Sequence, residues 1–145
     1  MKIFTIGFTK KPAQSFFGLL RSANVERLID VRLNNVSQLA GFAKKDDLKF
    51  FTNEICHIGY EHWKDLAPTR EMLDRYKKDK GDWKEYELCF LDLMRQRRIE
   101  ESLSKERFAS SCLLCSEDKP HFCHRRLVAE YLQEKWGDVD IIHVG

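Results

Sequence analysis

Apolar runs alternate with amphipathic stretches along the whole chain. The runs have the length and the bounding turn residues of β-strands, and the stretches between them repeat apolar side chains at the three- and four-residue spacing of helices. The pattern predicts strands at Lys2–Phe8, Val25–Arg32, Ile58–Trp63, Ser110–Cys115 and Asp140–Val144, and helices at Pro12–Ala23, Asp46–Cys56, Thr69–Lys78, Trp83–Leu103 and Pro120–Trp136.

This alternation predicts the fold class. Strands joined through helices pair in parallel, because each connection crosses over the sheet. We therefore expect an α/β fold, a single three-layer sandwich with a mainly parallel sheet of about four or five strands flanked by helices. The length of 145 residues suits a single domain over residues 1–145, and no repeat or linker divides it. Gly137 follows the last predicted helix, where a helix end favours positive φ.

Composition adds little to this picture. A hydrophobic fraction of 43% is typical of globular proteins. The chain has 25 basic and 23 acidic residues, so its net charge of +2 gives no strong electrostatic argument for nucleic-acid binding. Local basic runs such as Lys77-Lys78 and Arg95–Arg98 are interpreted as solvated helix faces.

The cysteines and the N-terminal segment indicate a compartment. The N-terminal apolar run is too short for a signal peptide, and no stretch is long enough to cross a bilayer. Five cysteines are an odd number for a disulfide framework, so we expect reduced thiols. We predict a cytoplasmic protein without membrane association. The pattern leaves the oligomeric state open.

Three segments that are distant in sequence should meet at one edge of the sheet. In open α/β sheets, ligands bind beyond the carboxyl ends of the strands. That rule points to Gly7-Phe8-Thr9, to Arg32-Leu33-Asn34-Asn35, and to the stretch CSEDKPHFCHRR at 115–126. The last segment concentrates two cysteines, two histidines and two arginines within twelve residues.

A zinc knuckle is one interpretation of this segment. Cys112 and Cys115 have the two-residue gap of a knuckle, and Cys123-His124 would supply further ligands. The intervening residues are Leu-Leu within an apolar run, however, and positions three apart on a strand point to opposite faces. We therefore expect no metal and no cofactor.

A helix end that binds an anion is the second interpretation. His124 lies near the centre of the apolar face of the last predicted helix, with Cys123 and Arg125 on its flanks. Placed in the opening turn that begins near Pro120, its imidazole would point into the crevice. Unpaired N–H groups there favour an anion and lower the pKa of a nearby thiol. The alternative is a core histidine bonded to backbone, with Cys123 packed beside it.

Asp30 and Arg32 form a second candidate cluster. Asp30 lies in an apolar run where an unpaired carboxylate is costly, so Arg32 on the same strand face is its natural partner. Such a pair at a strand end serves a ligand or is purely structural, and we favour the ligand. The following loop offers hydrogen-bonding side chains for a phosphate-bearing ligand, although turn chemistry explains them equally well. These side chains are Asn34, Asn35, Ser37 and Lys44.

Together these residues resemble one family, domain of unknown function 488. The resemblance runs from end to end and rests on three motifs. These are Thr5-Ile6-Gly7, Asp30-Val31-Arg32, and Leu114-Cys115-Ser116-Glu117 followed by Pro120 and Cys123-His124-Arg125. The resemblance implies a compact α/β domain in which the three segments converge, and it implies no established reaction. Many relatives have histidine where this chain has Phe8, and the loop after Arg32 resembles that of a distinct branch.

Three functions remain open from the sequence. The first is an enzyme acting on a phosphate-bearing substrate, such as a nucleotide or a nucleic-acid end. The second is a module that binds nucleic acid or protein without catalysis, through the Asn-rich loop and the arginines of the 95–98 run. The third is a redox-active thiol pair, Cys115 and Cys123. The candidate catalytic residues are Cys115, Cys123, His124 and Asp30, and the candidate ligand-binding residues are Gly7, Thr9, Arg32, Asn34, Asn35, Ser37, Lys44, Glu117 and Arg125.

Overall fold

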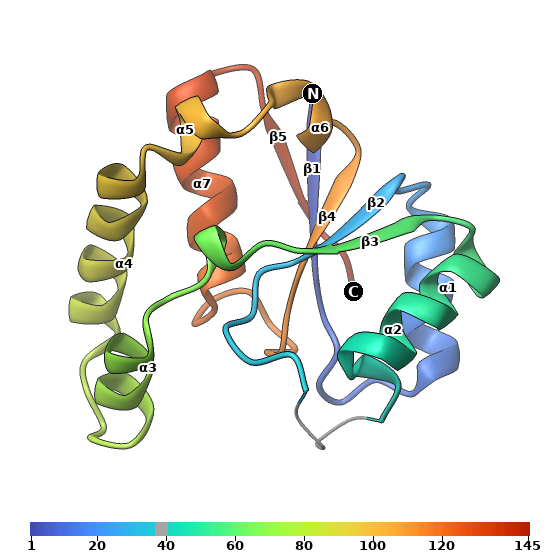
Figure 1. Cartoon of the computed structure of the whole chain (residues 1–145), viewed down its shortest axis with the longest axis horizontal. Helices are drawn as coiled ribbons and strands as arrows, with labels where there is room; N and C mark the ends of the chain where they lie inside the picture. The colour runs from blue at the N-terminus through green and yellow to red at the C-terminus, as the bar shows by residue number, and fades with distance from the viewer. Residues whose placement is uncertain (37–40) are drawn as a thin grey trace.

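A single all-parallel sheet forms the centre of the molecule (Figure 1). The structure is a computed structural model that describes residues 1–36 and 41–145. Within these residues, five strands lie in the order β3-β2-β4-β1-β5, which confirms the predicted fold class. They are β1 Lys2–Gly7, β2 Arg27–Asp30, β3 Gly59–His62, β4 Ser111–Cys115 and β5 Asp140–His143.

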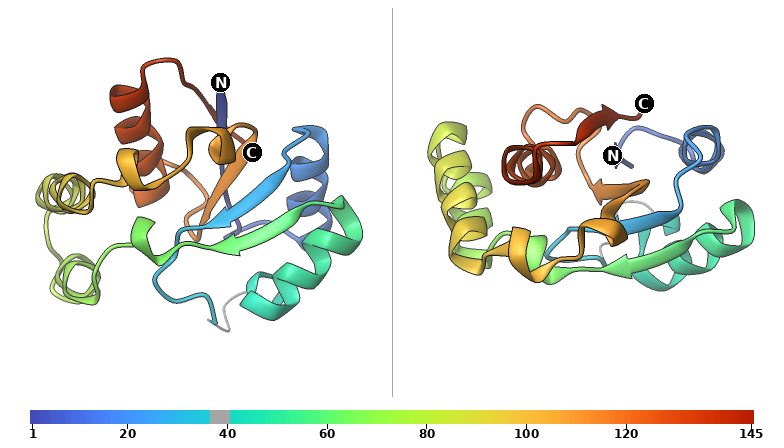
Figure 2. Two further views of the ribbon diagram at one scale, coloured as in Figure 1. Left: turned by 45° about the horizontal axis from the view of Figure 1, so that its top comes forward. Right: turned by 90° about the horizontal axis from the view of Figure 1, so that it is seen from above.

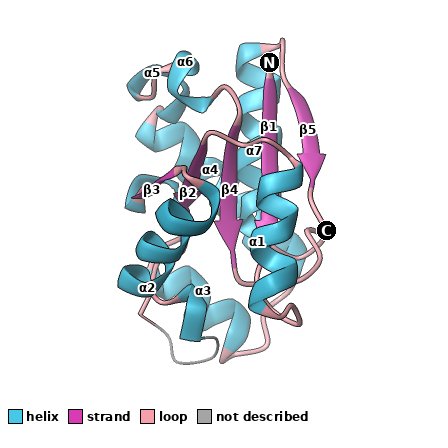
Figure 3. Ribbon diagram, turned by 90° about the vertical axis from the view of Figure 1, so that its right-hand side faces the viewer, coloured by secondary structure: helices cyan, strands magenta, loops and turns pink. Residues whose placement is uncertain are grey.

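The strand register aligns the carboxyl ends of the central strands. Gly7 of β1 lies opposite Cys115 of β4, and Asp30 of β2 lies opposite Leu114. Figure 3 shows these strands side by side, with β1 between β4 and β5. The segments that follow β1, β2 and β4 therefore leave the sheet at one edge, as the sequence predicts.

Helices cover both faces of the sheet (Figure 2). Helices α1 and α2 lie on one face and α3, α4 and α7 on the other, which gives three layers. No helix within the described residues is long and apolar enough to cross a membrane. The helices are α1 Ala13–Ser22, α2 Lys45–Phe51, α3 Arg70–Lys77, α4 Trp83–Arg97, α5 Ile99–Ser102, α6 Lys105–Phe108 and α7 His124–Trp136, with short 3-10 turns η1 Gly41–Ala43 and η3 Lys64–Leu66 and a π turn η2 Thr52–Cys56.

Alternate strand residues supply the two halves of the core. Leu113 and Cys115 pack with α4 and α7, whereas Cys112 and Leu114 pack with α1. A strand directs successive side chains to opposite faces, so this division follows directly from the pleat. The prediction that Cys112 and Cys115 point to opposite faces is confirmed.

Helix ends differ from the predicted ones at two places that matter for the core. The predicted helix Trp83–Leu103 is broken, because Arg98 adopts a left-handed backbone with φ of 50° and α5 then starts at Ile99. The break lets the side chain of Ile99 enter the core. The predicted helix Asp46–Cys56 changes at Thr52 from α-helical to π-helical hydrogen bonding. At the C-terminal end of α7, Gly137 has the expected positive φ of 84°.

The last helix begins later than the sequence suggests. The predicted start at Pro120 is wrong, because α7 begins at His124 and Cys123 is its extended N-cap residue, with φ of −137°. Cys123, His124 and Arg125 therefore do not occupy the second half of an opening turn. The residues between β4 and α7 form a loop instead. This loop carries the functional candidates.

Candidate functional site

A cavity of about 290 Å³ opens beyond the carboxyl ends of β2 and β4. One wall is the loop between β4 and α7, and the other is formed by α3 and the start of α4. Among the residues proposed from sequence, six line this cavity. They are Arg32, Asn34, Cys115, Glu117, Cys123 and His124.

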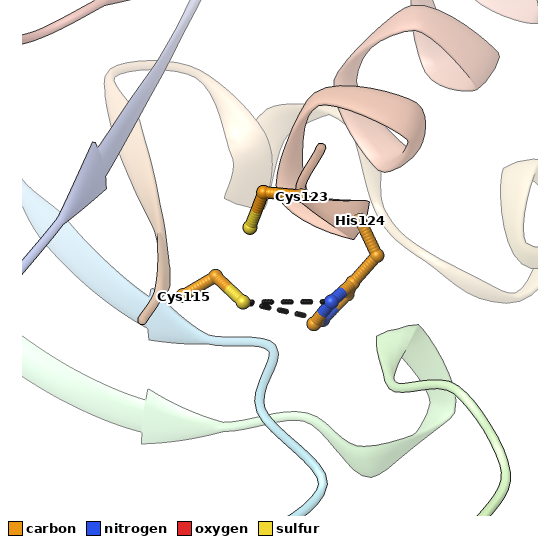
Figure 4. A group of neighbouring side chains, drawn as sticks. All are labelled: Cys115, Cys123 and His124. Atoms are coloured by element: carbon orange, nitrogen blue, oxygen red, sulfur yellow. Dashed lines mark hydrogen bonds between the residues drawn. The ribbon is translucent and has the colours of Figure 1, made fainter. Parts of the chain in front are cut away.

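Cys115, Cys123 and His124 form a close cluster in this cavity (Figure 4). Cys115 is the last residue of β4, Cys123 caps α7, and His124 is the first residue of that helix. Their two thiol sulfurs and one imidazole nitrogen all lie within 4.8 Å of one another. The three side chains are buried, so the cluster lies at the bottom of the cavity and not on its rim.

The hydrogen bonds of His124 fix its tautomer. Its Nε2 atom lies 2.5 Å from the carbonyl oxygen of Val31, which can only accept a hydrogen bond. Nε2 therefore carries the proton, and a neutral imidazole then has its lone pair on Nδ1. Cys115 Sγ lies 3.4 Å from Nδ1 and 3.9 Å from Nε2, so the unprotonated nitrogen is the nearer acceptor for the thiol proton of Cys115. The bond to the Val31 carbonyl agrees with the alternative of a backbone-bonded core histidine, yet His124 also lines the cavity.

Burial and neighbouring groups separate the two thiols. The hydrogen bond from Cys123 and the charge of Arg125 lower the pKa of Cys115, against the effect of burial. Burial raises the pKa of Cys123 well above its ordinary value. Burial also lowers the pKa of His124, which favours the neutral imidazole. Cys115 is therefore the more acidic thiol of the pair.

The same three side chains are the residues that could hold a metal ion. No other group of three or more His, Cys, Asp or Glu side chains with ligating spacing occurs within residues 1–36 and 41–145. Two thiols and an imidazole are ligands that Zn²⁺ prefers. The zinc-knuckle pair considered from sequence is excluded, because Cys112 lies on the opposite face of the sheet.

Asp30 and Arg32 form the predicted ion pair. Arg32 donates from Nε to Asp30 Oδ1 at 2.9 Å and from Nη2 to Oδ2 at 2.8 Å. Asp30 is fully buried, does not line the cavity, and also accepts from the hydroxyl of Tyr60 at 2.5 Å. Asp30 thus holds Arg32, which lies 5.0 Å from the ring of Phe8. Burial opposes the charge of Arg32, but the bond and the charge of Asp30 outweigh it and raise the Arg32 pKa.

Gly7, Thr9 and Arg125 hold the loop after β4 and do not line the cavity. Arg125 is 1% exposed and donates from Nη1 to the carbonyl of Glu117 at 2.6 Å. Thr9 donates to the carbonyl of Ser116 at 2.5 Å. A Cβ atom on Gly7 would lie 1.6 Å from the Glu117 carbonyl oxygen, so only glycine fits there. These residues therefore fix the position of the loop that forms one wall of the cavity without lining the cavity themselves.

The loop after Arg32 contributes less than expected. Asn34 lines the cavity and accepts from the Val36 backbone at 3.1 Å, which is turn chemistry. Asn35 donates to Tyr60 at 3.2 Å, and Lys44 is the N-cap residue of α2. Neither of these two side chains lines the cavity. Ser37 lies outside the described residues.

The opposite wall of the cavity was not identified from sequence. Arg70, Lys77 and Lys78 line it, and Lys77 pairs with Glu117 across the cavity at 3.1 Å. A cluster of rings accompanies these cations. The sequence signal for this wall was the pair Lys77-Lys78 near aromatic residues. A solvated helix face explains that pattern equally well. The rings that line the cavity are Tyr76, Trp83, Tyr86 and Phe122.

One family model matches most of the chain. The model described as Domain of unknown function DUF488 matches residues 12–132. The chain belongs to the DUF488 family. This agrees with the resemblance seen in the sequence motifs. The match covers β2, β4 and the start of α7, and hence every member of the Cys–Cys–His cluster of this DUF488 protein. No curated protein and no solved structure matches the chain.

Proposed function

We propose that this DUF488 protein is a thiol-dependent enzyme acting on a phosphate-bearing substrate of the nucleotide or nucleic-acid-end class. One observation supports the proposal above all. Cys115 Sγ lies 3.4 Å from the unprotonated Nδ1 of His124, in a cavity with cations and aromatic rings on its wall. A nucleophile, a base and a third group that orients the base form the arrangement used in covalent catalysis. Here the orienting group is the Val31 carbonyl.

The reaction that this geometry supports is a nucleophilic substitution. His124 Nδ1 takes the proton of the Cys115 thiol, and Sγ forms a bond to an electrophilic atom of the substrate. The bond to the leaving group breaks, and the leaving group takes that electron pair and the proton held by His124. In the second half, His124 takes a proton from water, the oxygen of that water displaces Sγ, and the thiol regains its proton. Both protons are accounted for, and no oxidant or reductant is needed.

The cavity wall supports the choice of substrate class. Arg70, Lys77 and Lys78 place positive charge where a phosphate group would bind. Trp83 stacks on Tyr86 with ring centroids 5.0 Å apart and planes 22° apart, and the ring of Phe122 lies 5.5 Å from that of Trp83. Base–aromatic stacking contributes about 1–3 kcal/mol per base, so a substrate with both a ring and a phosphate fits this wall best.

The alternative of a pure binding module has less support. It uses the Asn-rich loop and the arginines of the 95–98 run, and of these Arg97 already donates to the carbonyls of Asp65 and Ala67 at 2.7 and 2.8 Å. Thiol redox chemistry is the second candidate, because the sulfurs of Cys115 and Cys123 lie within 4.8 Å of each other. Loss of two hydrogens under mild oxidant, measured by mass spectrometry, tests it. For all of these functions we propose the cytoplasm, where free thiols persist.

Product formation from a panel of nucleotides and short oligonucleotides, followed by chromatography and mass spectrometry, tests the proposal. We expect Cys115→Ser to abolish turnover and His124→Ala to lower it by about 10²–10⁴-fold, the contribution of a general base. Cys89→Ser is the matched control, because Cys89 is an exposed cysteine of α4. Full turnover by Cys115→Ser would refute the nucleophile. Salt-sensitive binding without any product would favour the binding module instead.

A further inference from the structure

We propose that Cys115, Cys123 and His124 also form a Zn²⁺ site whose fourth coordination position faces the cavity. The proposal does not depend on whether the protein is an enzyme. It does have a consequence for the proposed function, because a zinc ion bound to Cys115 would occupy the nucleophilic sulfur. Zinc would then hold the protein in a form that cannot attack a substrate.

The spacing of the donor atoms supports a single ion. Zinc–sulfur bonds of about 2.3 Å and zinc–nitrogen bonds of about 2.0–2.1 Å place neighbouring donors of a tetrahedral site about 3.3–3.8 Å apart. Cys115 Sγ and His124 Nδ1 are already 3.4 Å apart. All donors of the cluster lie within 4.8 Å of one another, so closing around an ion needs movements of about an ångström.

The imidazole has one nitrogen that is free to bind a zinc ion. Metal-binding histidines usually donate their other ring N–H to a carboxylate or a backbone carbonyl, which fixes the ring and the tautomer. His124 donates from Nε2 to the carbonyl of Val31, which leaves the lone pair on Nδ1. The ring is held further by Phe90, whose centroid lies 5.4 Å away. Nδ1, the nitrogen without a proton, is therefore available to an ion, and Cys115 Sγ lies nearer to it than to Nε2, at 3.4 Å against 3.9 Å.

Charge balance favours a divalent ion over an empty pair of thiolates. The three side chains are between 3% and 6% exposed, so two thiolates without a metal ion would be costly to bury. Two thiolates and one Zn²⁺ sum to zero, with the two thiol protons released to solvent. Sulfur ligands select Zn²⁺ over Mg²⁺ and Ca²⁺, which prefer oxygen.

The fourth position stays open to the cavity. Within the described part of the chain, no fourth His, Cys, Asp or Glu side chain joins the group. All three ligands line the cavity, so water or a small anion can complete the coordination from that side. Three protein ligands and an exchangeable fourth are typical of reactive zinc sites, whereas structural sites are closed by four.

Cobalt substitution tests the site directly. Metal-free protein is titrated with Co²⁺, and the thiolate-to-cobalt charge-transfer absorption is followed, with Mg²⁺ as the negative control. We expect one equivalent of Co²⁺ per chain, displaced by Zn²⁺. Cys123→Ala and His124→Ala should lose the absorption, whereas Cys89→Ala should keep it, because Cys89 is exposed on α4. No absorption in the parent protein, or unchanged absorption in both cluster variants, would overturn the proposal.

A protection experiment on the unaltered protein covers the case in which a variant does not fold. Iodoacetamide labelling is mapped by mass spectrometry with and without Zn²⁺. Zinc should protect Cys115 and Cys123 from labelling and leave Cys89 labelled. Equal labelling of Cys115 and Cys123 with and without zinc would overturn the site. The two proposals separate here. If the protein binds cobalt but Cys115 does not react with iodoacetamide in metal-free protein, only the proposed enzyme is refuted. If Cys115 reacts but no metal binds, only the proposed zinc site is refuted.

Discussion

The Nε2 atom of His124 donates to the carbonyl oxygen of Val31 across 2.5 Å, from the first residue of α7 to the residue after β2. This one bond decides which imidazole nitrogen carries the proton and which is left to act as a base. A protein backbone carbonyl cannot donate, so the bond excludes the other neutral tautomer. The group that orients the His124 base beside the Cys115 thiol is thus a backbone carbonyl, which no side-chain substitution removes.

The first prediction concerns the reactivity of Cys115. Because His124 Nδ1 is the acceptor for its thiol proton, His124→Ala should slow alkylation of Cys115 in metal-free protein by about 100-fold, the lower range for loss of a general base. Peptide mapping after timed exposure to iodoacetamide gives the rate. Cys89 in the same samples is the internal control and should react at an unchanged rate. Equal rates for Cys115 in parent and variant would contradict the role of His124.

The second prediction concerns the packing of β1 against the loop that carries the site. Gly7→Ala places a Cβ atom 1.6 Å from the Glu117 carbonyl oxygen and 3.0 Å from the guanidinium of Arg125. We expect the free energy of unfolding to fall by about 3 kcal/mol, the upper range for overpacking. Urea denaturation measures it. In Gly18→Ala the new methyl group meets no atom of the described residues within 4 Å, so this helical control should gain about 0.5–1 kcal/mol. A similar response of both variants would contradict the close approach at Gly7.

The sheet was predictable from sequence because its determinants are local. The central strands β1, β2 and β4 are short, mostly buried runs, and Leu113 and Cys112 follow the alternation that a strand requires. The convergence of Gly7, Arg32 and Cys115 at one edge then follows from parallel pairing alone. The ion pair of Asp30 was predictable too, since a buried carboxylate needs a partner.

The cavity wall was not predictable, because it depends on how the connections cross over the sheet. Trp83 and Tyr86 read as core residues of a helix, and nothing in their spacing says that they face a cavity. Arg125 shows the opposite error. It was expected to bind an anion, but it donates to the Glu117 and Asp118 carbonyls because the loop folds back over it. Whether an arginine donates to the protein's own backbone or to a ligand depends on the path of the loop around it.

The third prediction addresses the helix break that the sequence concealed. Arg98 has a left-handed backbone with φ of 50°, which costs a non-glycine residue about 1–2 kcal/mol. Arg98→Gly should therefore raise the free energy of unfolding by about 1 kcal/mol, part of the gain being offset by glycine's larger entropy in the unfolded chain. Arg95→Gly, within the helical part of α4, should lower it by a similar amount. Thermal and urea unfolding measure both, and a loss of stability in Arg98→Gly would contradict the assignment.

The fourth prediction concerns anion affinity. Glu117 pairs with Lys77 at 3.1 Å and so competes with a phosphate for that cation. Glu117→Gln should tighten binding of adenosine monophosphate by about twofold to fivefold, the effect of one exposed ion pair. Titration calorimetry at low salt measures it. Asp92→Asn changes the net charge equally at an exposed site of α4 that does not line the cavity, and should leave the affinity unchanged. Weaker binding in Glu117→Gln would instead mean that the carboxylate contacts the ligand.

The fifth prediction separates the structural from the ligand-binding role of the buried ion pair. Asp30→Ala leaves the guanidinium of Arg32 buried without its main partner, so the free energy of unfolding should fall by about 3–5 kcal/mol. Adding Arg32→Met removes the uncompensated charge, and the double variant should be more stable than Asp30→Ala alone. Urea denaturation of the four proteins gives the coupling energy. If the two effects simply add, the pair contributes no interaction energy. If the double variant folds but no longer binds adenosine monophosphate, Arg32 acts on the ligand as well as on the core.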